Sequence, residues 1–294
     1  MASFLAGLLV SAGMDVTLTD EWIEGLQIIR RDGIRLETGN KTVQTPVKTL
    51  FPQEETESFL YALVLLKTWQ TDWAAASLKG RLQPNATVLT LQNGLGNDSI
   101  LKKDWPVEKV ISGITTLGAT LMTPGHVRAF NQGVISLEDK PAAGAFKDLF
   151  CQAGLDCKLE KDIQNKVWGK LMINAAINPL TAIFEQPNGW LLENPQADII
   201  IQQIIKETTL LCTTLNITLP YDDPFEEIKR VAKNTSSNIS SMLQDLRRLA
   251  PTEINRINGA IVNLGKANGI PTPVNQTLTS LVKIKLQTMK RGIK

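Results

Sequence analysis

The sequence predicts an α/β protein of two domains, in which a domain of mixed strands and helices precedes an all-helical domain. The chain has 294 residues, more than a single hydrophobic core usually serves. Short apolar runs typical of parallel strands recur in the first half, whereas the pattern after Asp162 is almost wholly helical. We therefore expect domains at 1–160 and 161–294, with the boundary near Glu160-Lys161.

The composition restricts the partners and the chemistry of the chain. Lys and Arg number 31 against 29 Asp and Glu, and a net charge of +2 does not indicate nucleic acid or an anionic membrane as partner. No apolar run reaches the roughly 20 residues that span a bilayer, and the apolar start lacks the positive region of a signal peptide. Three cysteines without metal-ligand spacing fit a reducing cytoplasm. Because His126 is the single histidine, we expect no metal site, and proton chemistry must come from Lys, Glu or Asp.

The first elements predict the second half of a dinucleotide-binding unit. Ser3 to Ala12 has helical periodicity, and Asp15 to Thr19 is expected to form a strand that ends in Asp20. In a Rossmann-type domain such a helix follows a G-x-G-x-x-G loop, and an acid at the end of the next strand binds the ribose. The first strand and the glycine loop are absent from this sequence. We expect the sequence to be a fragment, or its true start to lie upstream, with Met1 inside the glycine loop.

Further strands and helices complete the first domain. Gly39-Asn40 is a strong hairpin signal between two short strands. The strands Val127 to Phe130 and Val134 to Leu137 are expected to pair antiparallel around Asn131-Gln132-Gly133. The other expected elements are helices at Trp22–Arg31 and Ala142–Ala153 and strands at Ile34–Glu37, Thr42–Val47, Tyr61–Leu66, Thr87–Leu91 and Val110–Ile114.

Polar side chains follow two of the apolar strands at their carboxyl ends. Lys67 comes directly after YALVLL, and Asn93 lies in the glycine-containing segment QNGLGN. In open α/β sheets ligands bind outside these strand ends, so Lys67 and Asn93 are candidates for contacts with a phosphate, a ribose or another ligand. A solvated lysine and a turn without function are the alternatives.

The second domain is predicted to contain five helices after an opening one. Pro251 is expected at a first helical position, which places Glu253 in the first turn, where the helix dipole favours a carboxylate. Asn238 and Ser241 are expected to share a helix face with Asp245, although the run NTSSNISS also suits capping. The five expected helices are Ala197–Leu215, Phe225–Lys233, Ser240–Leu249, Thr252–Ala267 and Val274–Lys290.

The opening helix of this domain carries a polar stripe on an otherwise apolar surface. Lys170, Asn174 and Asn178 follow one another at i, i+4 and i+8 within KVWGKLMINAAINPL. The groups could satisfy one another within a core, but a buried ammonium is costly and is seldom kept without a function. Pro179 is expected to bend or end the helix and to leave a carbonyl one turn earlier without its usual donor. The sequence therefore predicts a polar hollow that could take a polar ligand.

These residues together resemble the ketopantoate reductases, the 2-dehydropantoate 2-reductase family of pantothenate synthesis. The likeness runs from about Ser3 to Lys290 and is most specific in KLMINAAINPLTAIFEQPNG and NISSMLQDLRRLAPTEINRINGAIVNLGKANGIPTP, with support from VLLKTWQT and LQNGLGN. It implies a Rossmann-type nucleotide-binding domain followed by a helical domain, with the site in the cleft between them. It also implies that NADPH passes a hydride to the carbonyl carbon of ketopantoate, a 2-oxo acid.

The resemblance implies roles for individual residues. Lys170 matches a general acid that protonates the carbonyl oxygen, and Glu253 matches a carboxylate that meets the lysine and the nicotinamide side of the cofactor. The implied substrate-binding residues are Lys170, Asn174, Asn178, Asn188, Asn238 and Ser241, and the cofactor-binding candidates are Lys67, Asn93, Ala119, Glu253 and Asp20.

Two departures from the family pattern keep alternatives open. The glycine loop is missing, and Asp20 stands where NADPH-dependent members usually carry a basic residue. Since an acid there repels a 2′-phosphate, we expect NADPH on family grounds with NAD as the alternative. The alternative functions are reduction of another 2-oxo acid and a non-catalytic nucleotide-binding role. The expected setting is cytoplasmic, with a small-molecule substrate and a possible homodimer.

Overall fold

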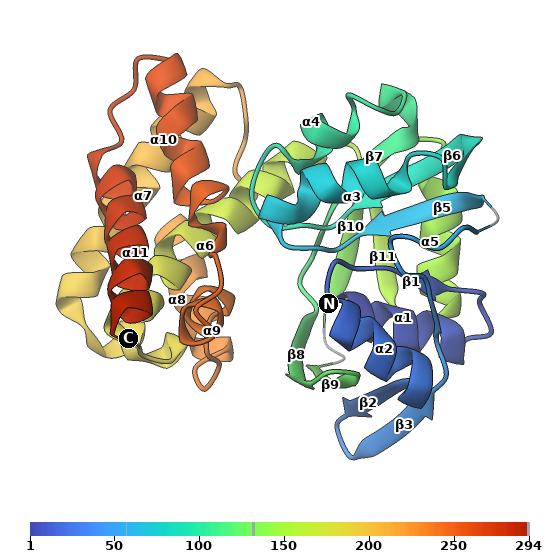
Figure 1. Ribbon diagram of the computed structural model, residues 1–294. Helices are drawn as coiled ribbons and strands as arrows, with labels where there is room; N and C mark the ends of the chain where they lie inside the picture. Colours follow the sequence, from blue (N-terminus) through green and yellow to red (C-terminus); the bar gives the residue numbers. More distant parts are fainter. Residues whose placement is uncertain (57, 131–132, 293–294) are drawn as a thin grey trace. The chain divides into compact units, whose positions relative to one another are not determined.

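The computed structural model forms two compact units, which are drawn in Figure 1. Unit 1 contains Met1–Gln92 and Asn97–Ile163, and unit 2 contains Asn93–Gly96 and Gln164–Lys294. The short segment Asn93–Gly96 thus belongs by its contacts to the helical unit, although along the chain it connects strand β6 (Leu82–Thr90) with helix α4 (Asn97–Leu101) of unit 1. The structure describes residues 1–294 except 57, 131–132 and 293–294.

Unit 1 is built on a five-stranded sheet with the order β11-β10-β7-β6-β5. Strands β5, β6 and β7 run parallel, whereas β10 is antiparallel to β7 and parallel to β11. The register pairs Val88 with Val110 and Leu89 with Ile111, and all four side chains are fully buried. Burial of consecutive residues is typical of parallel strands covered on both faces. The bounds are β5 Phe59–Val64, β6 Leu82–Thr90, β7 Val110–Thr115, β10 Val134–Glu138 and β11 Asp156–Glu160.

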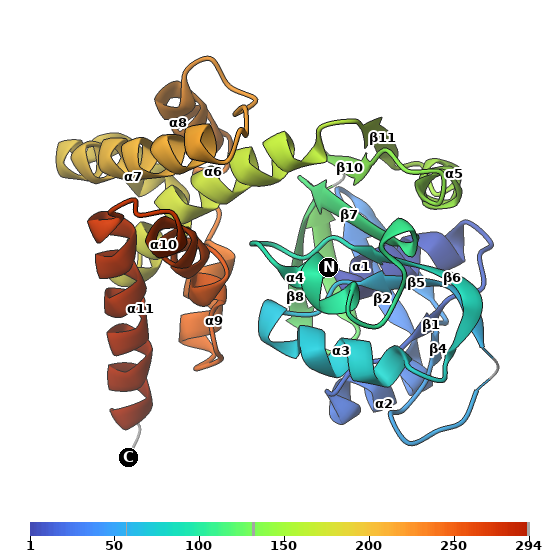
Figure 2. The same cartoon turned by 90° about the horizontal axis from the view of Figure 1, so that it is seen from above.

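Helices cover both faces of this sheet, as Figure 2 shows. Ile111 packs in a core with Phe4 of α1 and Phe150 of α5. Its neighbour Val110 points to the opposite face and packs with Leu101 of α4 and with α3. This layering confirms the predicted α/β class with a Rossmann-type first domain. The bounds are α1 Ala2–Ser11, α3 Thr71–Leu78, α4 Asn97–Leu101 and α5 Ala143–Gln152, with short 3-10 turns at Thr68–Gln70 and Val107–Lys109.

A second, four-stranded sheet in unit 1 corrects one predicted pairing. Its order is β3-β2-β9-β8, and the hairpin of β2 and β3 turns at Gly39 as predicted. The predicted hairpin of β9 with β10 is wrong, because β9 pairs with β8 and β2 while β10 pairs with β7 and β11. Residues 131–132 of the expected turn lie outside the described residues. The bounds are α2 Ile23–Asp32, β2 Ile34–Thr38, β3 Lys41–Thr45, β8 Gly118–Thr123 and β9 His126–Phe130.

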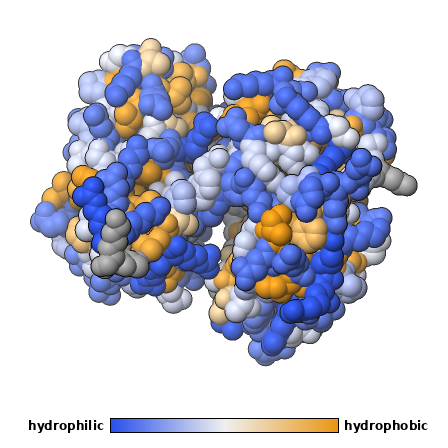
Figure 3. All heavy atoms as spheres, in the orientation of Figure 1, coloured by the Kyte–Doolittle hydropathy of each residue, from blue (hydrophilic) through white to orange (hydrophobic). Residues whose placement is uncertain are grey.

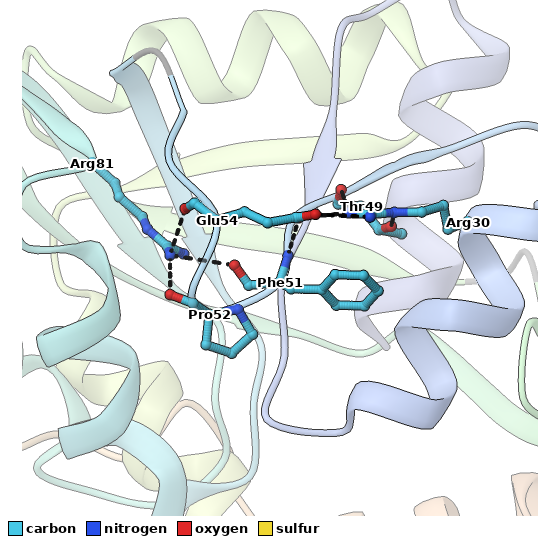
Figure 4. Close-up of polar contacts among 6 residues, drawn as sticks. All are labelled: Arg30, Thr49, Phe51, Pro52, Glu54 and Arg81. Carbon is cyan, nitrogen blue, oxygen red and sulfur yellow. Dashed lines mark hydrogen bonds and ion pairs between the residues drawn. The ribbon is translucent and has the colours of Figure 1, made fainter.

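Two arginines fix the loop that leads into β5, as Figure 4 shows. The guanidinium of Arg30 donates to both carboxylate oxygens of Glu54, at 2.9 and 2.6 Å, and stacks over the ring of Phe51. Arg81 donates to the backbone carbonyls of Phe51, Pro52 and Glu54. The bond from Arg30 is the main cause that lowers the pKa of Glu54 to about 2. The loop is therefore held by charge-assisted hydrogen bonds instead of by regular secondary structure.

Unit 2 is helical and is organised around α6. Its core gathers buried residues from α6, α7, α8, α9, α10 and α11, among them Met172, Ile204 and Leu246. No helix in the described part of the chain is long and apolar enough to cross a membrane. The bounds are α6 Ile163–Phe184, α7 Pro195–Thr214, α8 Pro224–Asn234, α9 Ser241–Arg247, α10 Asn258–Ala267 and α11 Pro273–Arg291, with 3-10 turns at Asn188–Glu193 and Glu253–Asn255.

Helix α6 continues past Pro179 to Phe184, so the expectation that the helix could end there is wrong. Proline removes the backbone donor that would reach the carbonyl of Ala175. In the structure that carbonyl accepts a hydrogen bond of 3.0 Å from the side-chain amide of Asn258. The carbonyl of Ala175 thus lacks its backbone donor, as predicted, and the buried side chain of Asn258 from α10 donates to it instead.

The same asparagine continues a buried polar chain through unit 2. Asn258 donates to the side chain of Asn275 at 3.0 Å, and Asn275 donates to the carboxylate of Glu207 at 2.7 Å. Glu207 also accepts from the first backbone amides of α11, at Val274 and Asn275. These bonds connect α6, α7, α10 and α11, and they stabilise the segment that carries the polar stripe.

Candidate active site

Helix α6 presents the predicted polar stripe inside unit 2. Lys170 and Asn174 are half-buried and Asn178 is buried, one turn apart along the helix. The flanking residues Met172 and Ala176 are fully buried in the core. The stripe is therefore the polar edge of a buried helix rather than a solvated face.

The ammonium of Lys170 is the titratable group at the centre of this stripe. Burial lowers its pKa to about 8, and the nearby carboxylate of Glu253 acts in the opposite direction. Glu253 is itself buried, at the start of the 3-10 turn before α10. A lysine with a pKa near neutrality is suited to proton transfer, because both of its protonation states are accessible at working pH.

Asn93 joins this pair within unit 2. Its side-chain amide lies 3.3 Å from a carboxylate oxygen of Glu253, although the two residues are 160 positions apart in sequence. Leu95 donates its backbone N–H to the carbonyl of Arg256, which fixes the loop Asn93–Gly96 against the turn that carries Glu253. At Gly94 the backbone has φ of 78°, and a side chain would collide with the Arg256 carbonyl. Glycine is therefore required for this close approach.

The predicted substrate residues Asn188 and Asn238 also meet in unit 2. The backbone N–H of Asn188 donates to the carbonyl of Asn238 at 3.0 Å, and its side-chain amide donates to the hydroxyl of Thr235. Its side-chain oxygen is buried without a hydrogen-bond partner among the described protein atoms. An acceptor of this kind is available to a hydroxyl or amide donor.

The segment around Ser241 departs from the expected helix. Helix α9 begins at Ser241, so Asn238 lies before the helix and the two residues do not share a helical face. Ser240 is the N-cap, and its hydroxyl accepts from the backbone of Leu243 and bonds the hydroxyl of Thr181 on α6. Ser241 itself is exposed. The capping alternative thus applies to Ser240.

The position of Glu253 also differs in detail from the prediction. Pro251 is not helical, and the expected helix Thr252–Ala267 is split into the 3-10 turn Glu253–Asn255 and α10. Glu253 therefore does not lie in the first turn of a long α-helix. Its position is set by the turn, which aims it at Asn93 and Lys170.

The remaining candidates lie in unit 1. Lys67 follows β5 as predicted, is half-buried and has its ammonium 5.7 Å from the ring of Trp69. Asp20 follows the short strand β1 (Thr17–Leu18), where it accepts from the backbone N–H of Trp22, and burial raises its pKa. Ala119 lies in β8 opposite Ala129.

The residues present fit part of a nicotinamide dinucleotide. A carboxylate follows β1 for a ribose, and Lys67 follows β5. The pattern G-x-G-x-x-G does not occur within residues 1–294. No cluster of three or more metal-ligating side chains occurs among the described residues.

Two contributors were missed in the sequence. Asn258 was not singled out because an asparagine in a helical pattern gives no signal of its long-range partner, although Pro179 signals that some donor is needed. Arg256 supplies the backbone carbonyl that holds the Asn93 loop, and no sequence pattern reveals a main-chain contact of this kind.

A Rossmann-type unit and a helical unit that carries a half-buried lysine beside a buried carboxylate define a nicotinamide-dependent oxidoreductase. Residues 1–142 match the family described as ketopantoate reductase PanE/ApbA, and residues 162–286 match its C-terminal domain. The chain belongs to this family.

Curated relatives and solved structures agree with this assignment. The chain is 31% identical to 2-dehydropantoate 2-reductase of Halobacterium salinarum over 97% of this chain and 95% of that protein. It is 32% identical to the enzyme of the same name from Archaeoglobus fulgidus, over 96% and 94%. Among solved structures, a PanE/ApbA family ketopantoate reductase from Ralstonia eutropha JMP134 has a TM-score of 0.91 at 29% identity over 98% and 95%. D-mandelate dehydrogenase with NADH and anilino(oxo)acetate has a TM-score of 0.93 at 26% identity over 97% and 95%.

Proposed function

We propose that this chain is a 2-dehydropantoate 2-reductase, which reduces the keto group of ketopantoate to the hydroxyl of pantoate with NADPH as hydride donor. The observation that carries the proposal is the Lys170 ammonium, half-buried on α6 with a lowered pKa and accompanied by the Glu253 carboxylate. Membership of the ketopantoate reductase family supports the reaction and the substrate.

Lys170 is proposed to hold and then transfer the proton of the reaction. A bound reduced nicotinamide supplies the hydride to the carbonyl carbon. The ammonium stabilises the negative charge that develops on the carbonyl oxygen and gives that oxygen its proton, which leaves a neutral amine. Because the pKa of Lys170 is about 8, solvent can return the proton near neutral pH.

Glu253 and the amides are proposed to orient the reactants. The carboxylate of Glu253 favours the charged form of Lys170 and holds the side chain of Asn93. Amide and hydroxyl groups can grip the carboxylate and hydroxyl oxygens of a 2-oxo acid without adding charge. These proposed substrate residues are Asn174, Asn178, Asn188, Asn238 and Ser241.

The cofactor contacts are proposed to come from Lys67, Asn93 and Ala119, with Asp20 at the ribose. Asp20 and the adjacent Glu21 place two carboxyl groups after β1, and acids there accept from a ribose 2′-hydroxyl and repel a 2′-phosphate. This observation favours a second candidate, an NADH-dependent reductase of another 2-oxo acid. The similarity to the D-mandelate dehydrogenase structure with NADH also supports it.

Steady-state assays on the purified chain separate these candidates. Oxidation of NADPH or NADH, followed by nicotinamide absorbance, is measured with ketopantoate and with aromatic and aliphatic 2-oxo acids. The proposal expects the highest kcat/KM for ketopantoate with NADPH. Preference for NADH and an aromatic 2-oxo acid would establish the second candidate, and absence of turnover from folded protein would leave a non-catalytic role.

Substitution of the lysine tests the assignment of the proton donor. Lys170→Ala is expected to lower kcat by at least about 100-fold, the usual contribution of a positioned general acid. Lys161→Ala removes an exposed lysine two residues before α6 and is the matched control. Near-normal turnover by Lys170→Ala would remove Lys170 from the catalytic role.

A homodimer and a cytoplasmic location complete the proposal. Four apolar side chains on α7 and α11 are exposed, namely Ile199, Leu210, Leu281 and Ile284. Exposed apolar side chains of this kind are available for a subunit interface. The free thiols of Cys151, Cys157 and Cys212 fit a reducing compartment. Light scattering after size-exclusion chromatography measures the oligomeric state, and Leu281→Lys with Ile284→Lys should weaken the dimer.

A further inference from the structure

The hydroxyl of Thr71 is buried at the first position of helix α3. Most residues on the face drawn in Figure 3 are hydrophilic, and water reaches exposed polar groups of this kind. Thr71 is 0% exposed, so its hydroxyl depends on partners within the protein. A threonine at a helix start commonly bonds a carbonyl a few residues earlier, and Thr71 does so with Thr68 at 3.0 Å. Its other two contacts are not local.

Both ends of the Asn93–Gly96 loop meet at this hydroxyl. The side-chain amide of Gln92 donates to Thr71 Oγ1 at 3.0 Å, from 21 positions away. The side-chain oxygen of Asn97 lies 3.3 Å from the same hydroxyl, from 26 positions away, and shares its single proton with the Thr68 carbonyl. Gln92 directly precedes the loop and Asn97 directly follows it. One side chain in unit 1 therefore contacts the residues on either side of the loop.

The side chain of Gln92 has its donors and its acceptor in use. Its oxygen accepts from the hydroxyl of Thr90 at 3.0 Å. Its nitrogen donates to the carbonyl of Leu66 at 2.9 Å and to Thr71 at 3.0 Å. Thr90 ends β6 and Leu66 lies just after β5, so the network is built at the carboxyl ends of two parallel strands. Loss of the Thr71 hydroxyl would leave one buried N–H of Gln92 unpaired, which favours a rearrangement of the network.

The proposed cofactor contacts Lys67 and Asn93 are direct neighbours of this network in sequence. Lys67 lies between Leu66 and Thr68, and both of these donate a carbonyl to the network as acceptor. Asn93 directly follows Gln92. The network therefore sets the spacing between the backbone at Lys67 and the backbone at Asn93.

We propose that Thr71 is a positioning residue for the reductase reaction, which keeps Lys67 and Asn93 at a fixed spacing through its hydroxyl. The inference rests on the proposed function, because the roles of Lys67 and Asn93 as cofactor contacts are assigned there. Thr71 acts through Gln92 and Asn97 and is not a catalytic residue. Groups held in place before the cofactor arrives do not have to be ordered on binding, which favours both affinity and a productive geometry.

Hydrogen exchange on the intact chain tests the positioning. Thr71→Val replaces the hydroxyl by a methyl group, and Thr71→Ser keeps it. Amide exchange at 92–97, where the Leu95 N–H donates to the Arg256 carbonyl, should be at least about tenfold faster in Thr71→Val and within about twofold of wild type in Thr71→Ser. The matched control is Thr208→Val, which removes a hydroxyl that is also 0% exposed and bonds the Ile204 carbonyl within α7. It should leave exchange at 92–97 unchanged.

Cofactor binding tests whether the positioning serves the reaction. The Kd of NADPH and of NADH is measured by titration of nicotinamide fluorescence, which requires no turnover. For the cofactor that wild type prefers, Kd should rise at least about tenfold in Thr71→Val and stay within about twofold in Thr71→Ser and in Thr208→Val.

Two results would overturn the inference: unchanged exchange at 92–97 in Thr71→Val, or faster exchange with an unchanged Kd. Failure of the proposed function shows in the wild type, which would then bind neither cofactor, and the positioning role would fail with it. Failure of the inference alone shows in Thr71→Val beside a wild type that binds and turns over.

Discussion

The charge of Glu253 is expected to set the pH above which Lys170 loses its proton and the proposed reaction slows. Burial lowers the pKa of Lys170 to about 8, and Glu253 opposes that shift. Glu253→Gln keeps the shape of the side chain and its ability to accept from Asn93 but removes the charge. Loss of an opposite charge within about 4–6 Å typically shifts a pKa by about 1–3 units. The pKa of Lys170 in Glu253→Gln should therefore fall from about 8 to about 7 or below.

The magnitude follows from the fraction of Lys170 that is protonated. With a pKa of about 8, half of the enzyme carries the ammonium at pH 8, and a drop of one unit leaves about one tenth. The rate at pH 8 should therefore fall about fivefold more than the rate at pH 6, where the ammonium persists in both forms. The measurement is kcat/KM across pH 5.5–9.5, at saturating cofactor, for wild type and Glu253→Gln.

The position of the alkaline limb, and not the absolute rate, decides the outcome. A general loss of cofactor or substrate contacts would lower the rate equally at all pH values. In Lys170→Arg, residual activity should lose the limb altogether, because a guanidinium stays protonated in this range. An unmoved limb in Glu253→Gln would refute the electrostatic coupling between Glu253 and Lys170.

Three further predictions address the cofactor, the β5 loop and the α6 helix. Asp20→Asn removes a charge that repels a 2′-phosphate. It should therefore raise the ratio of kcat/KM for NADPH to kcat/KM for NADH by about tenfold, which corresponds to about 1.4 kcal/mol. An unchanged ratio would exclude Asp20 from the ribose site. The depressed pKa of Glu54 contributes stability that is fully present above the unfolded pKa of 4.5 and is lost as pH falls through about 2. The urea midpoints of wild type and Glu54→Gln should therefore differ above about pH 5 and converge in acid. Asn258→Ala should cost about 1–3 kcal/mol of unfolding free energy by leaving the Ala175 carbonyl unsatisfied, and the cost should be smaller in a Pro179→Ala background, where a backbone donor is restored.

The sequence predicted the layers and much of the site because these depend on local pattern. YALVLL predicts a parallel strand covered on both faces. The parallel strand β5 forms over most of it, but Tyr61 is exposed, so the predicted full burial is wrong. Lys170, Asn174 and Asn178 share an edge of α6 because helical geometry alone brings i, i+4 and i+8 together. The family resemblance named Asn93 and Glu253 both as cofactor contacts. Their direct contact was not predicted, because no sequence periodicity connects residues 160 positions apart.

The errors arose where partners are decided by tertiary packing. Strands β9 and β10 are neighbours in sequence, yet Ile135 and Leu137 of β10 are fully buried in the main sheet while β9 completes the other sheet. Short-range turn signals favoured the hairpin, but the burial of each strand's apolar face determined the pairing. The helix break before α10 was missed for a similar reason, because the 3-10 turn at Glu253 is fixed by contacts with the Asn93 loop.

The persistence of α6 through Pro179 shows how a local rule and a tertiary contact combine at this site. Proline in a helix interior costs about 3 kcal/mol or more when the freed carbonyl finds no donor. Asn258 supplies that donor to Ala175. Its own position is fixed by Asn275 at the start of α11, which in turn bonds Glu207 of α7. Because the helix continues, Thr181 lies in the next turn, where its hydroxyl bonds Ser240 at the N-cap of α9. One continuous helix therefore carries the polar stripe and also anchors the start of α9. Asn238, which bonds the backbone of Asn188, lies directly before α9.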